Sequence, residues 1–163
     1  MQRRIQVKRG QILQSTGDKN TKIFVVESGL LRSYTIGNNG KEHIFMFAPE
    51  TWIIADVCSP EEPAQLMIDA IEESIVQVHI KDPDITIANK QMLRKRFFVM
   101  QNRIINLIST TAIERYDNFL DTYPNIVQRV PQRMVASFLG ITPEALSKAK
   151  SDRIKKRNDK QNS

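Results

Sequence analysis

The sequence predicts an α+β chain in which an N-terminal β-roll is followed by a long helix and then by a pair of shorter helices. Three observations lead to this prediction. Short alternating or β-branched segments separated by turn residues occupy residues 5–80. Near Lys81 the apolar spacing changes from that of strands to that of helices. A helical pattern interrupted by Gly140 follows in residues 129–156.

The strand-like part centres on KIFVVESGLLRSYTIGNNGKEHIFMF, residues 22–47. Ser28-Gly29 predicts one turn. Asn39-Gly40 predicts a tight hairpin of type I′, in which both central residues need positive φ. A further strand is expected in MIDAIEESIVQVHI, residues 67–80. Many short strands separated by turns predict a small barrel or a roll of the jelly-roll kind.

The long helix carries an apolar seam whose members are spaced by four, three, four and three residues: Leu93, Phe97, Met100, Ile104 and Leu107. A repeat of about 3.5 residues keeps one stripe facing a partner helix. A second apolar stripe beside the seam consists of Phe98, Ile105, Ile108 and Ala112. We expect the seam to pair with the same helix of a second subunit and the other stripe to pack on the β-roll. Packing of both stripes within the monomer is the alternative.

A connector helix is expected after the long helix. Thr111 and Glu114 fit a capping box, in which the hydroxyl bonds an amide of the first turn and the carboxylate reaches back. The helix should end near Thr122, because the residue before Pro124 is disfavoured in helical geometry.

The stretch RVPQRMVASFLGITPEALSKAKSDRIKK, residues 129–156, predicts two helices joined by a short turn. Pro131 suits a first helical turn, and Gly140 ends the first helix by adopting positive φ. Thr142 is a good N-cap before Pro143. The residues expected to face inward are Val135, Ala136, Phe138, Leu139, Ile141, Leu146 and Ala149. Two helices joined by about three residues that include Gly form the helix-turn-helix pattern; a plain helical hairpin is the alternative.

The outer surface of this motif predicts contact with DNA. Residues expected to reach base edges are Glu144, Ser147, Lys148 and Ser151. Residues expected to meet phosphates are Lys150, Arg153, Lys155, Lys156 and Arg157. Gln132, Arg133, Thr142 and Pro143 complete the predicted DNA-binding set.

The distribution of charge agrees with a polyanion-binding C-terminal part. Residues 129–163 contain 9 basic and 3 acidic residues, whereas residues 1–80 contain 8 and 10. A basic segment on a mildly acidic body is the usual electrostatic footprint of a nucleic-acid binder. A frayed terminus that is merely basic is the alternative.

Four segments are therefore predicted. Residues 1–81 form a β-roll sensor-like domain, and residues 82–123 form the dimerisation and connector helices. Residues 124–157 form the helix-turn-helix domain, and residues 158–163 form a disordered polar tail.

The sequence offers little for catalysis or for metal binding. Cys58 is the only cysteine, which excludes an intramolecular disulfide and four-cysteine metal sites. A cupin-like metalloenzyme would need clustered histidines, but the chain has only His43 and His79, well apart. Cys58 is expected to be a small loop or core residue, and Trp52 and Phe47 are expected to fill the roll. We predict no catalytic residue, no metal and no cofactor.

The chain is expected in the cytoplasm. No apolar run approaches the roughly 18 residues of a membrane span. The start, MQRRIQVKRG, has no apolar signal core behind its positive charges.

Three motifs resemble the Crp/Fnr family of bacterial transcription regulators: AIERYDNFLDTYPNIVQRVPQRMVASFLGITPEALSK, VESGLLRSYTIGNNGKEHIF and ETWIIAD. The resemblance covers almost the whole chain. It implies a cyclic-nucleotide-binding-like β-roll, a dimerisation helix and a DNA-binding domain. It also implies that Pro143, Glu144, Ser147 and Lys148 make the recognition-helix contacts. The implied partners are double-stranded DNA and a second copy of the chain, with RNA polymerase as a candidate, an unknown effector and no membrane.

Departures from the family pattern concern the effector pocket. The candidate residues of this pocket are Trp52, Ala55 and Asp56, and Ala55-Asp56 occupy the place of the family's Gly-Glu pair. No arginine lies between Arg32 and Arg94. A buried phosphate without a cationic partner is costly, so we predict no binding of cyclic AMP. The iron–sulfur version of the family needs several cysteines, which this chain lacks.

Further departures concern the two ends of the chain. Lys148 stands where the family commonly has Arg, which would supply a bidentate fork, and Ala149 stands where a larger aliphatic residue is usual. The helical segment that the family carries before the equivalent of Arg3 and the β-hairpin wing are not expected here. A degenerate member that acts as a ligand-binding or protein-interaction module is the alternative function.

Overall fold

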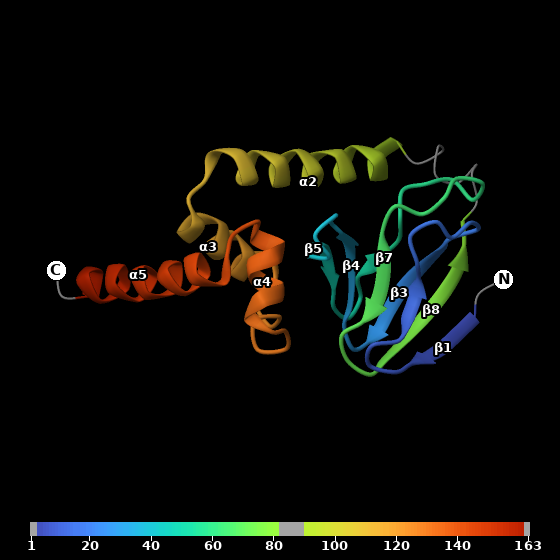
Figure 1. The fold of residues 1–163 in the computed structure, drawn as a ribbon, viewed down its shortest axis with the longest axis horizontal. Helices are drawn as coiled ribbons and strands as arrows, with labels where there is room; N and C mark the ends of the chain where they lie inside the picture. Colours follow the sequence, from blue (N-terminus) through green and yellow to red (C-terminus); the bar gives the residue numbers. More distant parts are fainter. Residues whose placement is uncertain (1–2, 82–89, 162–163) are drawn as a thin grey trace. The chain divides into compact units, whose positions relative to one another are not determined.

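The computed structural model describes residues 3–81 and 90–161 of the chain (Figure 1). The chain forms two compact units, Met1–Lys90 and Gln91–Ser163. Within the described residues, no helix combines the length and the apolar character that a membrane crossing requires.

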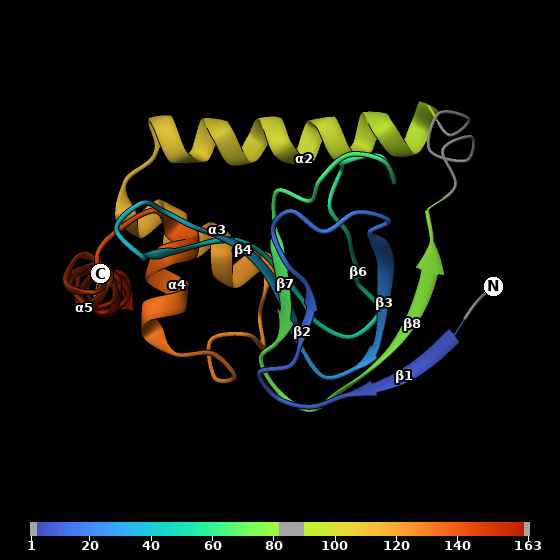
Figure 2. The ribbon, with the colours of Figure 1, turned by 45° about the vertical axis from the view of Figure 1, so that its right-hand side comes forward.

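The first unit is built from short antiparallel strands: β1 (Arg3–Val7), β2 (Ile12–Gln14), β3 (Lys22–Ser28), β4 (Leu31–Ile36), β5 (Glu42–Ala48), β6 (Ile53–Ile54), β7 (Met67–Ala70) and β8 (Ser74–Ile80). One sheet has the order β1-β8-β3-β6 and the other has the order β2-β7-β4-β5. Figure 2 shows β1, β3 and β8 on one side of the unit and β2, β4 and β7 on the other. This alternation between two sheets is the jelly-roll arrangement, so the predicted roll is confirmed; the sheets do not close into a barrel.

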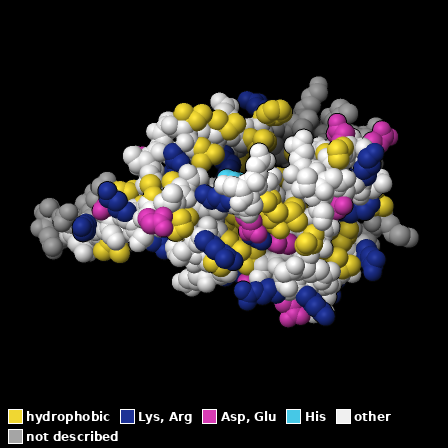
Figure 3. All heavy atoms as spheres, viewed as in Figure 1, with side chains coloured by type: hydrophobic (Ala, Val, Ile, Leu, Met, Phe, Trp, Pro, Cys, Tyr) yellow, Lys and Arg dark blue, Asp and Glu magenta, His cyan; other side chains and the backbone are white. Residues whose placement is uncertain are grey.

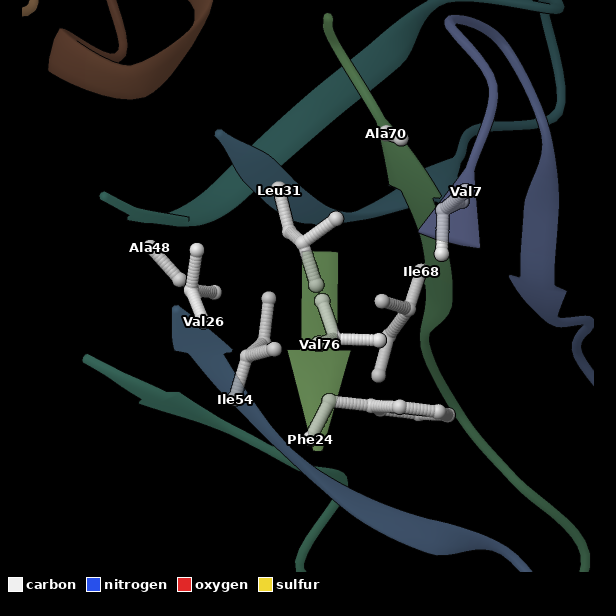
Figure 4. Close-up of a cluster of buried hydrophobic side chains, with 9 residues drawn as sticks. All are labelled: Val7, Phe24, Val26, Leu31, Ala48, Ile54, Ile68, Ala70 and Val76. Carbon is white, nitrogen blue, oxygen red and sulfur yellow. The ribbon is translucent and has the colours of Figure 1, made fainter. Parts of the chain in front are cut away.

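The core of the roll lies between the two sheets. Strand alternation directs every second side chain inward. Figure 4 shows the inward side chains meeting from both sheets: Val7, Phe24, Val26, Leu31, Ala48, Ile54, Ile68, Ala70 and Val76. Trp52 is partly buried and packs against this cluster, and Phe47 is fully buried. The expectation that these two aromatic residues fill the roll therefore agrees with the structure.

Two predicted turns form, and one has a different geometry. Gly29 follows β3 with φ +90°, and a Cβ there would lie 2.3 Å from the Ser74 Oγ, so both conformation and space require glycine. The β4–β5 hairpin closes with the Gly37 N–H donating to the Lys41 carbonyl and the Gly40 N–H donating to the Gly37 carbonyl.

The type I′ assignment for Asn39-Gly40 is wrong. Gly40 has φ +74°, but Asn39 is not among the residues with positive φ. The loop is instead the three-residue kind, in which an ordinary turn precedes one left-handed glycine.

The expectation of one strand in residues 67–80 is also wrong. The segment forms β7 and β8, which belong to different sheets. The chain turns at Ile71, whose N–H donates to the Leu30 carbonyl, and the Ser74 hydroxyl donates to the Glu72 carbonyl. No Gly, Pro or Asn marks this turn, so the sequence pattern concealed it.

Four helices are described after the roll: α2 (Lys90–Ser109), whose first residue closes the first unit, α3 (Ala112–Thr122), α4 (Gln132–Leu139) and α5 (Pro143–Gln161). The predicted capping box starts α3: the Thr111 N–H donates to the Glu114 carboxylate, and the Glu114 N–H donates to the Thr111 hydroxyl. The helix ends at Thr122, as predicted. The structure differs from the expected loose tail, because α5 continues through residues 158–161, where neither Gly nor Pro interrupts it.

Candidate nucleic-acid interface

The interface is supported by a small core that α3, α4 and α5 share. Three aromatic rings from α3 and α4 and the residue after α3 meet there: Phe119, Tyr123 and Phe138, with centroids 5.3 to 5.5 Å apart. Val135, Ala136 and Leu139 of α4 are buried, as predicted. Leu146 and Ala149 of α5 are 1% and 2% exposed, so both predicted inward positions are confirmed.

The turn between α4 and α5 has the predicted construction. Gly140 adopts the left-handed conformation, with φ 67° and ψ 31°, and the Ile141 N–H donates to the Ala136 carbonyl. Thr142 caps α5, because its hydroxyl accepts from the Ala145 N–H at 3.2 Å. Pro131 lies one position earlier than expected, at the N-cap of α4, and Ile141 is half-buried.

The first turn and a half of α5 presents the residues predicted to read bases. Pro143, Glu144, Ser147 and Lys148 are all exposed. Bonds from its own backbone N–H and from the Thr142 hydroxyl hold the pKa of Glu144 below its usual value. Glu144 thus offers a carboxylate acceptor at the start of α5, and Lys148 offers a donor one helical turn further along.

Two of the residues expected at phosphates are engaged within the protein. The Lys150 Nζ donates to the Gln132 Oε1 at 2.5 Å and lies 5.5 Å from the centre of the Tyr116 ring. Arg153 is half-buried and forms an ion pair with Asp117 of α3. These two cations, and Gln132, therefore join α5 to α3 and α4.

The remaining predicted contacts are placed as follows. Arg133, Thr142, Ser151 and Lys155 are exposed. The Ser151 hydroxyl donates back to the Ser147 carbonyl on the same helix. The side chains of Lys156 and Arg157 lie outside the described residues. Figure 3 shows Lys and Arg side chains on the surface of the second unit, including α5.

The apolar seam of α2 is exposed in the single chain. Met100 is 43% and Ile104 is 55% exposed, and Phe97 is more exposed still. Hydrophobic side chains are visible along α2 in Figure 3. The second stripe, which includes Phe98, Ile105 and Ile108, is exposed as well. The side chain of Leu93 lies outside the described residues, so pairing of the seam stays a prediction.

Sequence reasoning missed two arginines next to the turn. Arg103 of α2 donates to the Phe138 carbonyl, and Arg115 of α3 donates to the Leu139 carbonyl. Both carbonyls belong to the last residues of α4. The only signal was that Arg103 interrupts the apolar residues of the long helix.

Asp56, one of the candidate effector residues of the β-roll, has partners within the fold. Asp56 is 4% exposed, and its carboxylate accepts from the backbone N–H groups of Gln65 and Leu66, each at 2.8 Å. It therefore closes the loop after β6. Cys58 is buried in that loop, with its Sγ 3.5 Å from the Thr21 Oγ1 and 3.7 Å from the Lys81 Nζ.

Arg32 is the buried cation of the roll, and it is already paired. Its guanidinium donates to both oxygens of Asp69, at 2.8 and 2.9 Å, and to both oxygens of Glu42. Burial lowers the pKa of Arg32, but these hydrogen bonds and charges outweigh it and raise the pKa above its usual value. Across the described residues, no three His, Cys, Asp or Glu side chains are grouped as a metal site requires.

Solved structures share this architecture. FixK2 from Bradyrhizobium japonicum matches with a TM-score of 0.81 and 17% identity over 96% of this chain and 86% of that chain. A CRP/FNR family transcriptional regulator from Thermus thermophilus matches with a TM-score of 0.71 and 13% identity over 94% and 87%. The chain has the Crp/Fnr fold. A c-di-GMP responsive global regulator from Xanthomonas campestris, CLP, matches this Crp/Fnr fold with a TM-score of 0.71 and 12% identity over 95% and 87%.

The likeness is one of structure. Neither a protein-family model nor a curated protein matches this chain by sequence. The Crp/Fnr fold, predicted from three motifs, is therefore confirmed by architecture at identities below 20%.

Proposed function

We propose that this chain is a cytoplasmic transcription regulator that binds DNA in a sequence-specific manner as a homodimer and does not respond to cyclic AMP. The observation that carries the proposal is the exposed start of α5. A capped helix with Glu144, Ser147 and Lys148 free of the protein core stands on a turn of helix-turn-helix geometry. The proposed function assigns no catalytic role to the chain.

Base reading is supported by the chemistry of this exposed face. A carboxylate can accept from the cytosine amine, and an ammonium group can donate to guanine. The Glu144 carboxylate is exposed at the start of the helix, where it can accept such a bond. Lys155 and Arg133 are exposed cations on the same unit and would meet phosphates, which set affinity without reading sequence.

Dimerisation is supported by the exposed seam of α2. Apolar side chains at Phe97, Met100 and Ile104 gain from leaving water, and a spacing of about 3.5 residues lets them face the same helix of a second copy. A two-fold dimer would place its recognition helices in successive major grooves of a roughly palindromic site.

The absence of a cyclic AMP response is supported by the partners of two residues. Arg32, the buried cation of the roll, is held by Asp69 and Glu42, so releasing it for a ligand phosphate would take the buried Asp69 carboxylate away from its cation. Asp56 already accepts from three backbone N–H groups, those of Cys58, Gln65 and Leu66, and so has little capacity left for a ribose hydroxyl.

The test is fluorescence anisotropy of the full chain on a random-sequence duplex pool at several salt concentrations, followed by sequencing of the bound fraction. We expect a steep fall of affinity with salt, with a log–log slope of about 0.9 per phosphate neutralised. We also expect enrichment of a two-fold-symmetric motif. A flat salt response without enrichment would contradict the proposal and favour a ligand-binding or protein-interaction module.

A further inference from the structure

The last turns of α2 are joined to the helix-turn-helix through Arg103. Its Nη2 donates to the Phe138 carbonyl at 3.1 Å, and its guanidinium carbon lies 4.0 Å from the centre of the Phe138 ring. A planar guanidinium can stack on a ring and bond a carbonyl at the same time, which a lysine ammonium cannot do. One side chain of α2 therefore holds both the backbone and the ring of a residue at the end of α4.

Arg115 makes a second connection from α3. Its Nη2 donates to the Leu107 carbonyl at 2.7 Å, its Nη1 to the Leu139 carbonyl at 3.1 Å and its Nε to the Thr110 carbonyl at 3.2 Å. Carbonyls at the ends of helices have no partner within their own helix. Arg115 supplies partners to the end of α2, to the α2–α3 link and to the end of α4 together.

The turn itself packs against α2. A Cβ built on Gly140 would lie 3.2 Å from the Leu107 Cδ2. Leu107, predicted as a seam residue, therefore also contacts the turn of its own chain. Since α5 begins three residues after Gly140, any change of angle between α2 and this turn is carried to the recognition helix.

We propose that Arg103 and Arg115, the arginine clamp, are positioning residues that hold the helix-turn-helix at a fixed angle to α2 and thereby set the separation of the two recognition helices. A dimer with the clamp intact should therefore bind operators of one half-site spacing more tightly than operators of other spacings. The selection of operators by their half-site spacing rests on the proposed function. The fixed angle between α2 and the helix-turn-helix within one chain does not depend on it.

The angle is tested without DNA by double electron–electron resonance on the full chain. Spin labels are attached through Asn102→Cys on α2 and Ser151→Cys on α5, both exposed sites, in a Cys58→Ser background. Labelled protein is diluted into unlabelled protein, so that only distances within one chain are measured. We expect a narrow distribution for the parent and a broader or bimodal one for Arg103→Met and Arg115→Met. The control is Arg94→Met, which removes an exposed arginine from the same helix. Unchanged distributions in both clamp variants would overturn the proposal.

The spacing role is tested on three duplexes: the selected palindrome, the same palindrome with one inserted base pair, and a single half-site. One base pair rotates the half-sites by roughly 35° about the DNA axis. We expect the inserted base pair to lower the affinity of the unaltered chain about tenfold, which is the free energy of one charge-assisted hydrogen bond. The affinity of the clamp variants should fall less than about twofold. Their half-site affinity should equal that of the parent.

The outcomes separate the two proposals. Clamp variants that keep the parent's spacing preference, or that lose half-site affinity, would show that the arginines only support the fold of the motif. If the parent binds none of the duplexes, the proposed function fails, while the measured distances still decide whether the clamp holds the angle.

Discussion

At the scale of single residues, Lys148 and Glu144 are the side chains proposed to read bases. Both lie exposed at the start of α5, while Lys150 and Arg153, further along the same helix, are bound to Gln132 and Asp117. The side chains proposed to reach bases are thus separated along α5 from those that join this helix to its neighbours.

Replacement of Lys148 by Ala should reduce discrimination between binding sites by about 1 kcal/mol, because it removes a donor to base edges without disturbing the core. Sequencing of the selected duplexes measures this as a weaker base preference at one position of each half-site. The control is Lys155→Ala, which should lower affinity evenly across sequences. A motif unchanged in Lys148→Ala would show that this lysine reads no base.

Replacement of Gly140 by Ala should destabilise the second unit by about 1–2 kcal/mol, because a residue with a Cβ is strained at a φ of 67°. The new Cβ also presses on Leu107. Urea unfolding measures the change. Gly40→Ala is a matched control, with similar φ and nothing within 4 Å of its Cβ, so it carries the strain without the contact. A stability equal to the parent's would contradict the assignment of the turn.

At the scale of elements, α2 and α5 carry the two proposed interfaces. The seam of α2 leaves apolar side chains exposed in the single chain, and α5 extends over Pro143–Gln161, well beyond the inward-facing Leu146 and Ala149. In the proposed function, the first helix pairs its apolar face with a second copy, and the second helix supplies basic residues to phosphates.

Replacement of Ile104 by Glu should raise the dimer dissociation constant at least about 100-fold, because a carboxylate without a partner is costly in an apolar interface. Sedimentation equilibrium measures the change. Ile105→Glu, in the second stripe, is the matched control and should leave the dimer intact. Loss of the dimer only in Ile105→Glu would mean that the other stripe of α2 pairs.

The double variant Lys155→Ala with Lys156→Ala should weaken binding about equally on all duplexes and lower the log–log salt slope by about 1.8, for two phosphates released. Anisotropy at several salt concentrations measures the slope. A double change at Lys8 and Arg9, exposed cations of the β-roll, should leave it unaltered. An unaltered slope in the α5 variant would remove these residues from the interface.

At the scale of the whole molecule, a jelly roll and a helix-turn-helix unit are combined in one chain with the Crp/Fnr fold. In the roll, one candidate effector residue, Asp56, and the buried cation Arg32 both have partners within the fold. Asp56 closes a loop, and Arg32 joins β4 to β7 and β5.

Cyclic AMP at millimolar concentration should therefore change neither the thermal midpoint of unfolding nor the affinity for the selected operator. A ligand that binds only the folded state at 100 times its Kd would stabilise it by about 2.7 kcal/mol, so binding would be seen as a clear shift. Differential scanning fluorimetry with and without the nucleotide measures this. A shift of several degrees that saturates with concentration would contradict the prediction.

The sequence by itself determined the features that depend on local geometry. The capping box at Thr111, the left-handed Gly140 and the Thr142 cap follow from backbone sterics and from hydrogen bonds only a few residues apart. The inward positions of Leu146 and Ala149 follow from helical periodicity. Such features can be predicted because every atom involved lies close along the chain.

Tertiary structure alone decided the features that depend on which surfaces meet. The contacts of Lys150, Arg153 and Asp56 join segments that are far apart in the sequence, so no local pattern predicts them. The passage of β7 and β8 into different sheets, and the contacts of Arg103 and Arg115 with the end of α4, have no local signal. Their physical reason is that the buried carbonyls and charges find partners only once the helices and sheets have packed.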